Sequence, residues 1–214
     1  MAEIIEIARA DSLIARTALE KRVLGGGIAI FPADGLYGLA CDPLNAAAVE
    51  RIHALKGRDE GKPSAVMFFS PLAMRELVAT LGPRTRDAMG VLLPGPVTIV
   101  VANPERRYPL ACREDPERLG IRLIEGPLAG AGVALFQTSA NRSGAPAPAA
   151  FEQVDPALTA SVDLVIDGGR LSGAPSTVID LSGIERGAEP RILREGALPA
   201  DEISGLLASL SSQP

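Results

Sequence analysis

Short apolar runs that alternate with helix-forming segments constrain the fold of this chain more than any other feature. These runs are typical of buried strands and occur at 28–31, 65–69, 97–101, 120–124, 133–138, 164–167, 177–181 and 191–194. We expect the first run to end at Pro32. Capping residues predict helices between the runs: from Asp11 to about Leu24, from Asn45 to Gly57, from Ser70-Pro71, after Pro83, and over about 199–210.

Strands interleaved with helices indicate a layered α/β domain. The connections are too irregular for a doubly wound parallel sheet, so we expect a mixed, twisted sheet flanked by helices, of the α+β type. The 214 residues contain no linker-like stretch, and we expect residues 1–214 to form a single domain. Aromatic residues make up only 3% of the chain, so its core must be built from aliphatic side chains.

Composition excludes several classes of protein. No apolar run approaches the roughly 20 residues of a membrane span, and the first residues do not resemble a signal peptide, so we expect a cytoplasmic protein without a membrane partner. Cys41 and Cys112 form no metal-binding or disulfide pattern. The single histidine, His53, excludes a multi-histidine metal site, and it is expected to lie on a helix face without a catalytic role.

Charge is distributed unevenly along the chain. The formal net charge is −5, yet residues 51–122 carry 12 Lys/Arg against 8 Asp/Glu, an excess of +4. This basic excess coincides with Lys56, Arg58 and Lys62, three cations within seven residues. Each is either a favourable partner of a helix C-terminus or a phosphate ligand, and together they favour a bound triphosphate. The pattern predicts a local anion site rather than a broad nucleic-acid surface.

A turn of small polar residues follows one of the apolar runs. Ser139-Ala-Asn-Arg-Ser-Gly144 places hydroxyl groups and backbone N–H donors at the end of a strand, an arrangement suited to phosphate or carboxylate oxygens. An ordinary polar turn is the alternative. In a second turn, Pro32–Leu39, Gly35 and Gly38 permit close approach of a ligand to the backbone and Tyr37 offers a ring and a hydroxyl; a plain β-turn is again the alternative.

Three further residues are candidates for the same site. Arg122 lies inside an apolar strand, where a charge needs a partner; the partner is either a carboxylate of this protein or that of a substrate. Ser176 precedes a strand and Arg194 ends one, and each is either a binding residue or an ordinary turn or surface residue.

Seven motifs, taken in order, resemble the YrdC-like family of threonylcarbamoyl-AMP synthases. They span about residues 10–197: Pro32-Ala-Asp-Gly-Leu-Tyr-Gly-Leu39, Lys56-Gly-Arg58, Pro94-Gly-Pro-Val-Thr98, Ile121-Arg-Leu123, Ser139–Gly144, Ser176–Asp180 and Arg194-Glu-Gly196. The resemblance implies the YrdC-like fold and an ATP-dependent reaction of L-threonine with bicarbonate or CO₂. Pyrophosphate is released, and threonylcarbamoyl-AMP passes to a partner enzyme that modifies adenosine 37 of tRNA.

The resemblance also implies roles for residues. Lys56 and Arg58 are the catalytic cations, and Mg²⁺ accompanies ATP. The implied ATP ligands are Lys56, Arg58, Lys62, Ser139, Asn141 and Arg194. The implied positions near threonine or bicarbonate are Gly35, Tyr37, Met67, Arg122 and Ser176. No metal ligands of the protein are implied.

The chain departs from the family pattern mainly on the amino-acid side. Ala33 and Gly35 stand where the family has two threonines, and Met67 stands where many members have a histidine. Ala147 replaces a serine of some members, and Leu-Ile rather than Val-Pro follows Arg122. The nucleotide side of the site is therefore better preserved than the threonine side.

Three alternatives remain open at this point. A paralogue of the same fold would bind nucleotide but have lost or altered synthase activity. A non-enzymatic RNA-binding module, or at least weak RNA contact, is a second possibility, although the charge and the scarcity of aromatic residues disfavour it. A domain of a carbamoyl-transferring maturation enzyme is the third; such proteins carry additional Cys-rich domains, which this chain lacks.

Overall fold

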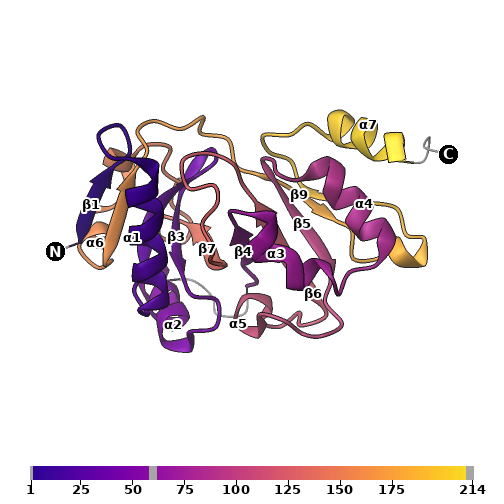
Figure 1. Ribbon diagram of the computed structural model, residues 1–214, viewed down its shortest axis with the longest axis horizontal. Helices are drawn as coiled ribbons and strands as arrows, with labels where there is room; N and C mark the ends of the chain where they lie inside the picture. Colours follow the sequence, from indigo (N-terminus) through magenta and orange to yellow (C-terminus); the bar gives the residue numbers. More distant parts are fainter. Residues whose placement is uncertain (1, 58–61, 211–214) are drawn as a thin grey trace.

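One mixed sheet of ten strands organises the chain (Figure 1). The computed structural model describes residues 2–57 and 62–210. The strands are β1 (Glu3–Glu6), β2 (Ala29–Ala33), β3 (Leu36–Cys41), β4 (Ala65–Phe68), β5 (Val97–Ala102), β6 (Arg118–Leu123), β7 (Leu135–Ser139), β8 (Leu164–Asp167), β9 (Thr177–Asp180) and β10 (Arg191–Arg194). Their order is β1-β8-β2-β3-β7-β4-β6-β5-β9-β10. Parallel and antiparallel pairs both occur in it, so the prediction of a mixed sheet flanked by helices is confirmed.

The helices begin where their capping residues predict. They are α1 (Ser12–Leu24), α2 (Ala46–Lys56), α3 (Pro71–Val78), α4 (Pro83–Leu92), α5 (Pro109–Cys112), α6 (Pro156–Thr159) and α7 (Ala200–Leu210), with short 3₁₀ turns at Phe151–Gln153 and Ile184–Arg186. Asp11, Asn45 and Ser70 each accept a backbone N–H of the first turn that they cap. The sequence did not predict β1, β3, α5 or α6. β1, α5 and α6 are only four residues long, and β3 begins inside the segment that was expected to be a turn.

The prediction that Pro32 ends the second strand is wrong. β2 continues to Ala33 and pairs with β3, with Pro32 opposite Tyr37. The backbone N–H of Tyr37 donates to the carbonyl of Pro148, and the carbonyl of Tyr37 accepts the N–H of Ala140. The backbone of Tyr37 therefore needs no hydrogen bond from Pro32. On the other side, β8 pairs with β2 only at Ala29 and Ile30. Proline is tolerated here because neither neighbour requires its missing N–H.

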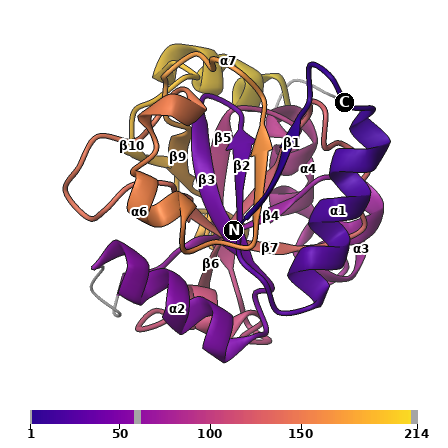
Figure 2. The same cartoon turned by 90° about the vertical axis from the view of Figure 1, so that its left-hand side faces the viewer.

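Two apolar clusters lie on opposite faces of the sheet. α1 covers one face through Ala15, Leu19 and Val23, while α2, α3, α4 and α7 contribute to the cluster on the other face. Figure 2 shows α1 and α2 on opposite sides of the central strands. Among the helices of the described residues, none is both long and apolar enough to cross a bilayer. The face under α1 is only partly covered, and this leaves room for a cavity.

Candidate active site

A cavity of about 500 Å³ lies on the same face of the sheet as α1, in the part that this helix does not cover. It is lined by the β2–β3 hairpin, by the start of β4, by β5, β6 and the end of β7, and by the segments around β9 and β10. Its floor follows β6, where Arg118, Gly120 and Arg122 all line the cavity. Alternate residues of a strand share one face, so two arginines stand on this floor about 13 Å apart.

Arg122 is buried and forms an ion pair with Asp34 in the turn between β2 and β3. The structure thus gives this arginine a carboxylate of the protein as its partner, the first of the two alternatives left open by the sequence. Burial raises the pKa of Asp34, and the guanidinium of Arg122 opposes that rise. Burial also lowers the pKa of Arg122, while Asp34 acts to raise it. Of the two partners only Arg122 lines the cavity, and the surroundings of the pair solvate its charges poorly.

Gly35 is required by close packing of the hairpin turn. A Cβ at this position would lie 2.0 Å from the carbonyl oxygen of Ala174 and 2.7 Å from the hydroxyl of Ser172. The segment containing Ala174 is held there because Gly173 donates its backbone N–H to the carbonyl of Gly35 over 2.9 Å. The threonine that the related family carries at this position has no room in this chain.

Adding a side chain at this turn is therefore expected to destabilise the protein. Gly35→Ala should lower the free energy of unfolding by about 1–3 kcal/mol, the usual effect of overpacking, because the obstructing atom belongs to the backbone. Gly90→Ala is the matched control, since a Cβ at Gly90 meets nothing within 4 Å and alanine favours a helix. Urea unfolding measures both variants. Equal stability of the Gly35→Ala variant and the unmodified protein would contradict the packing.

Tyr37 lines the cavity, but its hydroxyl is held by the protein. The hydroxyl donates to Asp167 over 2.9 Å or to the carbonyl of Gly169 over 2.8 Å, and it accepts the N–H of Gly168 over 2.9 Å. Burial and the bond to Asp167 raise the pKa of the phenol. The side chain thus anchors β3 to the loop after β8.

Loss of this hydroxyl should be visible in stability and in its dependence on pH. Tyr37→Phe leaves the N–H of Gly168 without its acceptor and should lower the free energy of unfolding by about 1–3 kcal/mol at neutral pH. The phenol with a raised pKa stabilises the fold below about pH 10, its unfolded value, and this contribution is lost as the pH rises toward the folded value. Unfolding followed from pH 7 to 11 should therefore show a shallower alkaline decline in Tyr37→Phe than in the unmodified protein.

Met67 lies beside the cavity rather than in its lining. It is fully buried in the apolar cluster under α1, and it pairs in register with Arg122 of the neighbouring strand. The thioether therefore lies next to Arg122 on the neighbouring strand, and it offers Arg122 an apolar neighbour instead of a hydrogen-bonding one.

Lys56 ends α2 and reaches the polar turn that follows β7. Its ammonium donates to the carbonyl of Ser139 and, over 2.6 Å, to the carbonyl of Asn141. In return, the backbone N–H of Ser143 donates to the carbonyl of Lys56 over 2.8 Å. Ser139 lines the cavity, whereas Lys56 and Asn141 are not part of its described lining. The predicted nucleotide residues of α2 and of the turn are thus brought together, with Lys56 fixing the turn.

The other two predicted cations are placed differently. Arg58 lies outside the described residues. Lys62 is exposed, directly before Pro63 and Ser64, which line the cavity. Lys62 is therefore positioned at the edge of the cavity.

Arg194 and Ser176 are in contact at another wall of the cavity. The guanidinium of Arg194 donates to the backbone carbonyl of Ser176 over 2.7 Å and to its hydroxyl over 3.2 Å. That hydroxyl also lies 2.9 Å from the hydroxyl of Thr98. Burial lowers the pKa of Arg194. The structure thus joins a predicted ATP residue to a predicted threonine residue.

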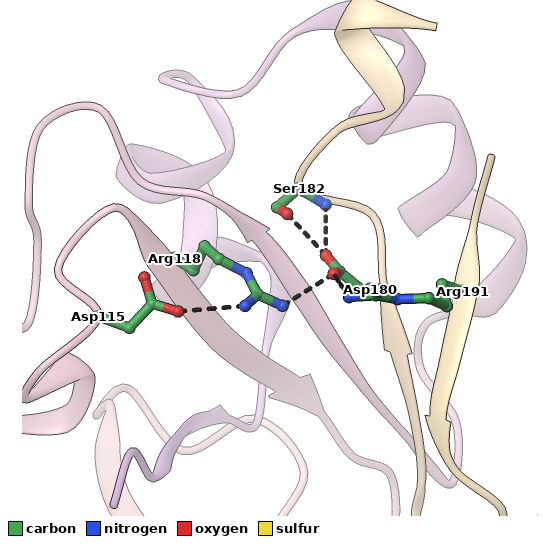
Figure 3. A network of polar contacts seen from close by, with 5 residues as sticks. All are labelled: Asp115, Arg118, Asp180, Ser182 and Arg191. Carbon is green, nitrogen blue, oxygen red and sulfur yellow. Dashed lines mark hydrogen bonds and ion pairs between the residues drawn. The ribbon is translucent and has the colours of Figure 1, made fainter. Parts of the chain in front are cut away.

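A second charged network, at the Arg118 end of the cavity, was missed in the sequence (Figure 3). Arg118 donates to Asp115 over 3.2 Å and to Asp180 over 2.8 Å. Asp180 also accepts from the N–H and hydroxyl of Ser182, and Arg191 lies 3.4 Å away. Burial works to raise the pKa of Asp180, but the bonds from Ser182 and the charge of Arg118 outweigh it and lower the pKa. The sequence did contain a signal for this network, because Arg118 and Arg122 are four residues apart in one apolar strand and therefore share a face.

The described residues offer no dedicated metal site. They contain no group of three or more His, Cys, Asp or Glu side chains that would hold a metal ion. Arg118 forms ion pairs with two carboxylates, those of Asp115 and Asp180.

Comparison with known proteins identifies relatives over most of the chain. A sequence model of the Sua5/YciO/YrdC family, described as telomere recombination, matches residues 21–196. A curated relative from Nitrosococcus oceani, named threonylcarbamoyl-AMP synthase, is 35% identical over 174 residues, which are 77% of this chain and 92% of the relative.

Solved structures share the fold. Sua5 of Pyrococcus abyssi, solved in complex with L-threonine, matches with a TM-score of 0.82 and 26% identity. The match covers 96% of this chain but only 60% of that protein. Escherichia coli YciO matches with a TM-score of 0.74 and 25% identity, over 92% of this chain and 97% of its own.

Proposed function

Because the chain belongs to the Sua5/YciO/YrdC family, we propose that it is an L-threonylcarbamoyladenylate synthase, a nucleotidyltransferase that acts on ATP, L-threonine and bicarbonate or CO₂. The observation that carries the proposal is the cavity itself. It brings the polar turn at Ser139, the buried Arg122 and the Arg194–Ser176 pair around one space. These residues come from four separate segments of the chain, and together they offer hydroxyl, amide and guanidinium groups to more than one substrate.

The proposed reaction has two chemical steps. The threonine amine forms a carbamate with bicarbonate, releasing water, or with CO₂, releasing a proton. A carbamate oxygen then attacks the α-phosphorus of ATP, the bond between the α-phosphorus and the bridging oxygen breaks, and pyrophosphate leaves. Transfer of this kind depends mainly on positioning and charge neutralisation, so the buried His53, whose ring is tilted against that of Phe136 at 5.7 Å, is not needed as a base.

The nucleotide is assigned to the polar turn and the cations around it. Ser139 and Asn141 would hold the nucleotide together with Arg194, and Lys56, Arg58 and Lys62 would neutralise its phosphates. Mg²⁺ would enter as part of the MgATP substrate. Lys56 supports the turn in addition, since its ammonium binds two carbonyls there.

L-Threonine is assigned to the part of the cavity between Arg122 and Ser176. Arg122 would bind the carboxylate and Ser176 the side chain or carboxylate, while Gly35, Tyr37 and Met67 shape the space around them. In this chain Gly35 contributes close packing, Tyr37 anchors the hairpin, and Met67 contributes apolar surface next to Arg122.

The product is proposed to serve tRNA modification in the cytoplasm. Threonylcarbamoyl-AMP would pass to a partner enzyme that forms threonylcarbamoyladenosine at position 37, and direct RNA contact would be weak at most because the net charge is −5. We further propose that residues 1–214 act as one domain, since one sheet takes strands from Glu3 to Arg194.

A second candidate function is a nucleotide-binding paralogue with a changed amino-acid site. The packing of Gly35 against Ala174 and the burial of Met67 favour it, because both alter positions assigned to the amino-acid side. The residues assigned to the nucleotide are the same in both proposals. Whether turnover depends on threonine therefore distinguishes the synthase from the paralogue.

The deciding experiment measures pyrophosphate release and the adenylate product with ATP, Mg²⁺ and bicarbonate. Reactions are run with L-threonine, with L-serine and without an amino acid. Turnover that requires both bicarbonate and threonine supports the synthase. ATP binding without threonine-dependent turnover would refute the synthase proposal and support the paralogue.

A further inference from the structure

Gln137 brings an uncommitted carboxamide to the cavity. It lies on β7, two residues before Ser139, and both residues line the cavity. The backbone of Gln137 pairs with β3 and β4, but its half-buried side chain has no hydrogen-bond partner among the described residues. Gln137 also lies outside the seven family motifs, and none of the substrates has been assigned to it.

The neighbours of Gln137 explain why its amide is uncommitted. The residues in register with it are Ala40 of β3 and Ala65 of β4, and neither side chain can form a hydrogen bond. Gly38, diagonally across on β3, gives the amide room, since a Cβ there would lie 3.0 Å from Nε2 of Gln137. Gly120 lies beside Ala65 on the floor of the cavity. Polar groups in proteins are normally hydrogen-bonded, so this amide offers its bonds to whatever fills the space over these small residues.

Gln137 lies between the residues assigned to ATP and to threonine. Residues two positions apart on a strand share a face and are about 7 Å apart, so Ser139 of the nucleotide turn is its neighbour along β7. In the other direction along β7, Leu135 is in register with Met67, and Met67 is in register with Arg122. The row of the sheet that contains Gln137 is therefore between the row of Ser139 and the row of Arg122. The group that joins the two substrates during the reaction has to occupy this middle position.

A carboxamide is complementary to that joining group. In the proposed reaction the amine nitrogen bonds to the carbon of bicarbonate, the bond from this carbon to the hydroxyl breaks, and the hydroxyl leaves with an amine proton as water. Bicarbonate and the carbamate each present an oxygen acceptor beside an O–H or N–H donor. The N–H and the carbonyl of an amide match these two groups with two parallel hydrogen bonds. Because the amide is neutral, it adds no general affinity for the phosphates of ATP.

We infer that the carboxamide of Gln137 binds bicarbonate and then the carbamate, with Nε2 donating to an oxygen and Oε1 accepting the O–H or N–H. Gln137 is thereby a further catalytic residue, because it touches the reacting group. The inference rests on the proposed function, in which bicarbonate is a substrate. It deepens that function by giving the one-carbon substrate a residue of its own, apart from Arg122 and the nucleotide turn. A carbamate held in one orientation keeps its attacking oxygen near the α-phosphorus.

Initial rates of pyrophosphate release by Gln137→Met test the inference, with potassium bicarbonate as the varied substrate. Methionine keeps the length and much of the volume of glutamine but removes both hydrogen bonds. The KM for bicarbonate should rise about 10- to 100-fold, the effect of losing two hydrogen bonds, while the KM values for ATP and L-threonine stay within about twofold. An unchanged KM for bicarbonate would overturn the inference, because Gln137 would then only fill the space over Gly38.

Gln153→Met is the matched control. Gln153 is the other glutamine of the described residues, and it is exposed and does not line the cavity. Its side-chain carbonyl accepts the N–H groups of Ala149 and Ala150. This variant should leave all three KM values unchanged. In Gln137→Met, a rise in the KM for ATP or for threonine as large as that for bicarbonate would also overturn the inference, because Gln137 would then belong to that substrate.

NMR of the unmodified protein keeps the inference testable if Gln137→Met does not fold, which circular dichroism reports. With L-threonine and a non-hydrolysable ATP analogue present, potassium bicarbonate should shift the proton and nitrogen signals of the Gln137 side-chain amide, and equimolar potassium chloride should not. Absence of a shift specific to bicarbonate overturns the inference. The measurement requires no turnover, so failure of the proposed function is distinguishable. A bicarbonate-specific shift without pyrophosphate release would support the inference while refuting the synthase.

Discussion

Arg122→Met is expected to abolish turnover and to lower the free energy of unfolding by about 3–5 kcal/mol. Methionine fills much of the same volume but leaves Asp34 half-buried without its counter-ion, and removing one partner of a buried pair has an effect of this size. The cavity also loses the cation assigned to the threonine carboxylate. Urea unfolding and pyrophosphate release measure the two consequences separately.

The matched control for this variant is Arg106→Met. Arg106 also pairs with a carboxylate, Glu117, at 2.6 Å, but both side chains are at least 60% exposed. Exposed pairs contribute about 0–1 kcal/mol, so this variant should unfold almost as the unmodified protein does and retain activity. If Arg122→Met were as stable as Arg106→Met, the prediction would be wrong, because the Asp34 carboxylate would then not need Arg122 as its counter-ion.

Lys56→Met is the second variant expected to have a large effect. In the unmodified protein the ammonium of Lys56 donates to the carbonyls of Ser139 and Asn141, and Lys56 is only 4% exposed. Without it, the turn assigned to the nucleotide loses its support and the site loses a cation. By analogy with other preorganised charge-stabilising donors, turnover should fall about 10²- to 10³-fold. Initial rates of pyrophosphate release at saturating ATP and threonine measure the loss.

Lys21→Met provides the comparison for Lys56→Met. Lys21 is an exposed lysine in the last turn of α1 and does not line the cavity, so its replacement removes one positive charge without touching the proposed site. Activity should stay within about twofold of the unmodified protein, since surface substitutions have small effects. Turnover of Lys56→Met at the level of the control would mean that the turn is held by the backbone alone.

Much of the secondary structure could be predicted because its causes are local. The capping side chains of Asp11, Asn45 and Ser70 act within three residues of their own positions. Gly57 adopts a left-handed conformation, with φ of 56°, at the end of α2 where the sequence places a terminating glycine. Pro32 is the counterexample, because its effect depended on which strands lie beside it.

The site was only partly accessible from the sequence. The motifs pointed to the segments containing Lys56, Ser139, Arg122, Ser176 and Arg194, and the structure brings Ser139, Arg122, Ser176 and Arg194 to one cavity. Which groups would be paired within it was not predictable. Arg122 and Asp34 are 88 residues apart, and Arg118 and Asp180 are 62 apart, so neither pair leaves a local pattern.

The sequence by itself determined where the longer helices begin, that eight apolar runs become strands, and that the family's nucleotide motifs are present, because caps, periodicity and motifs act over a few residues. Only the tertiary structure decided the cavity, the contact of Asp34 with Arg122, and the closure of Ala174 over Gly35. These features depend on the order of strands in space. That order places residues of distant segments within a hydrogen bond of each other, and no short-range pattern in the chain encodes it.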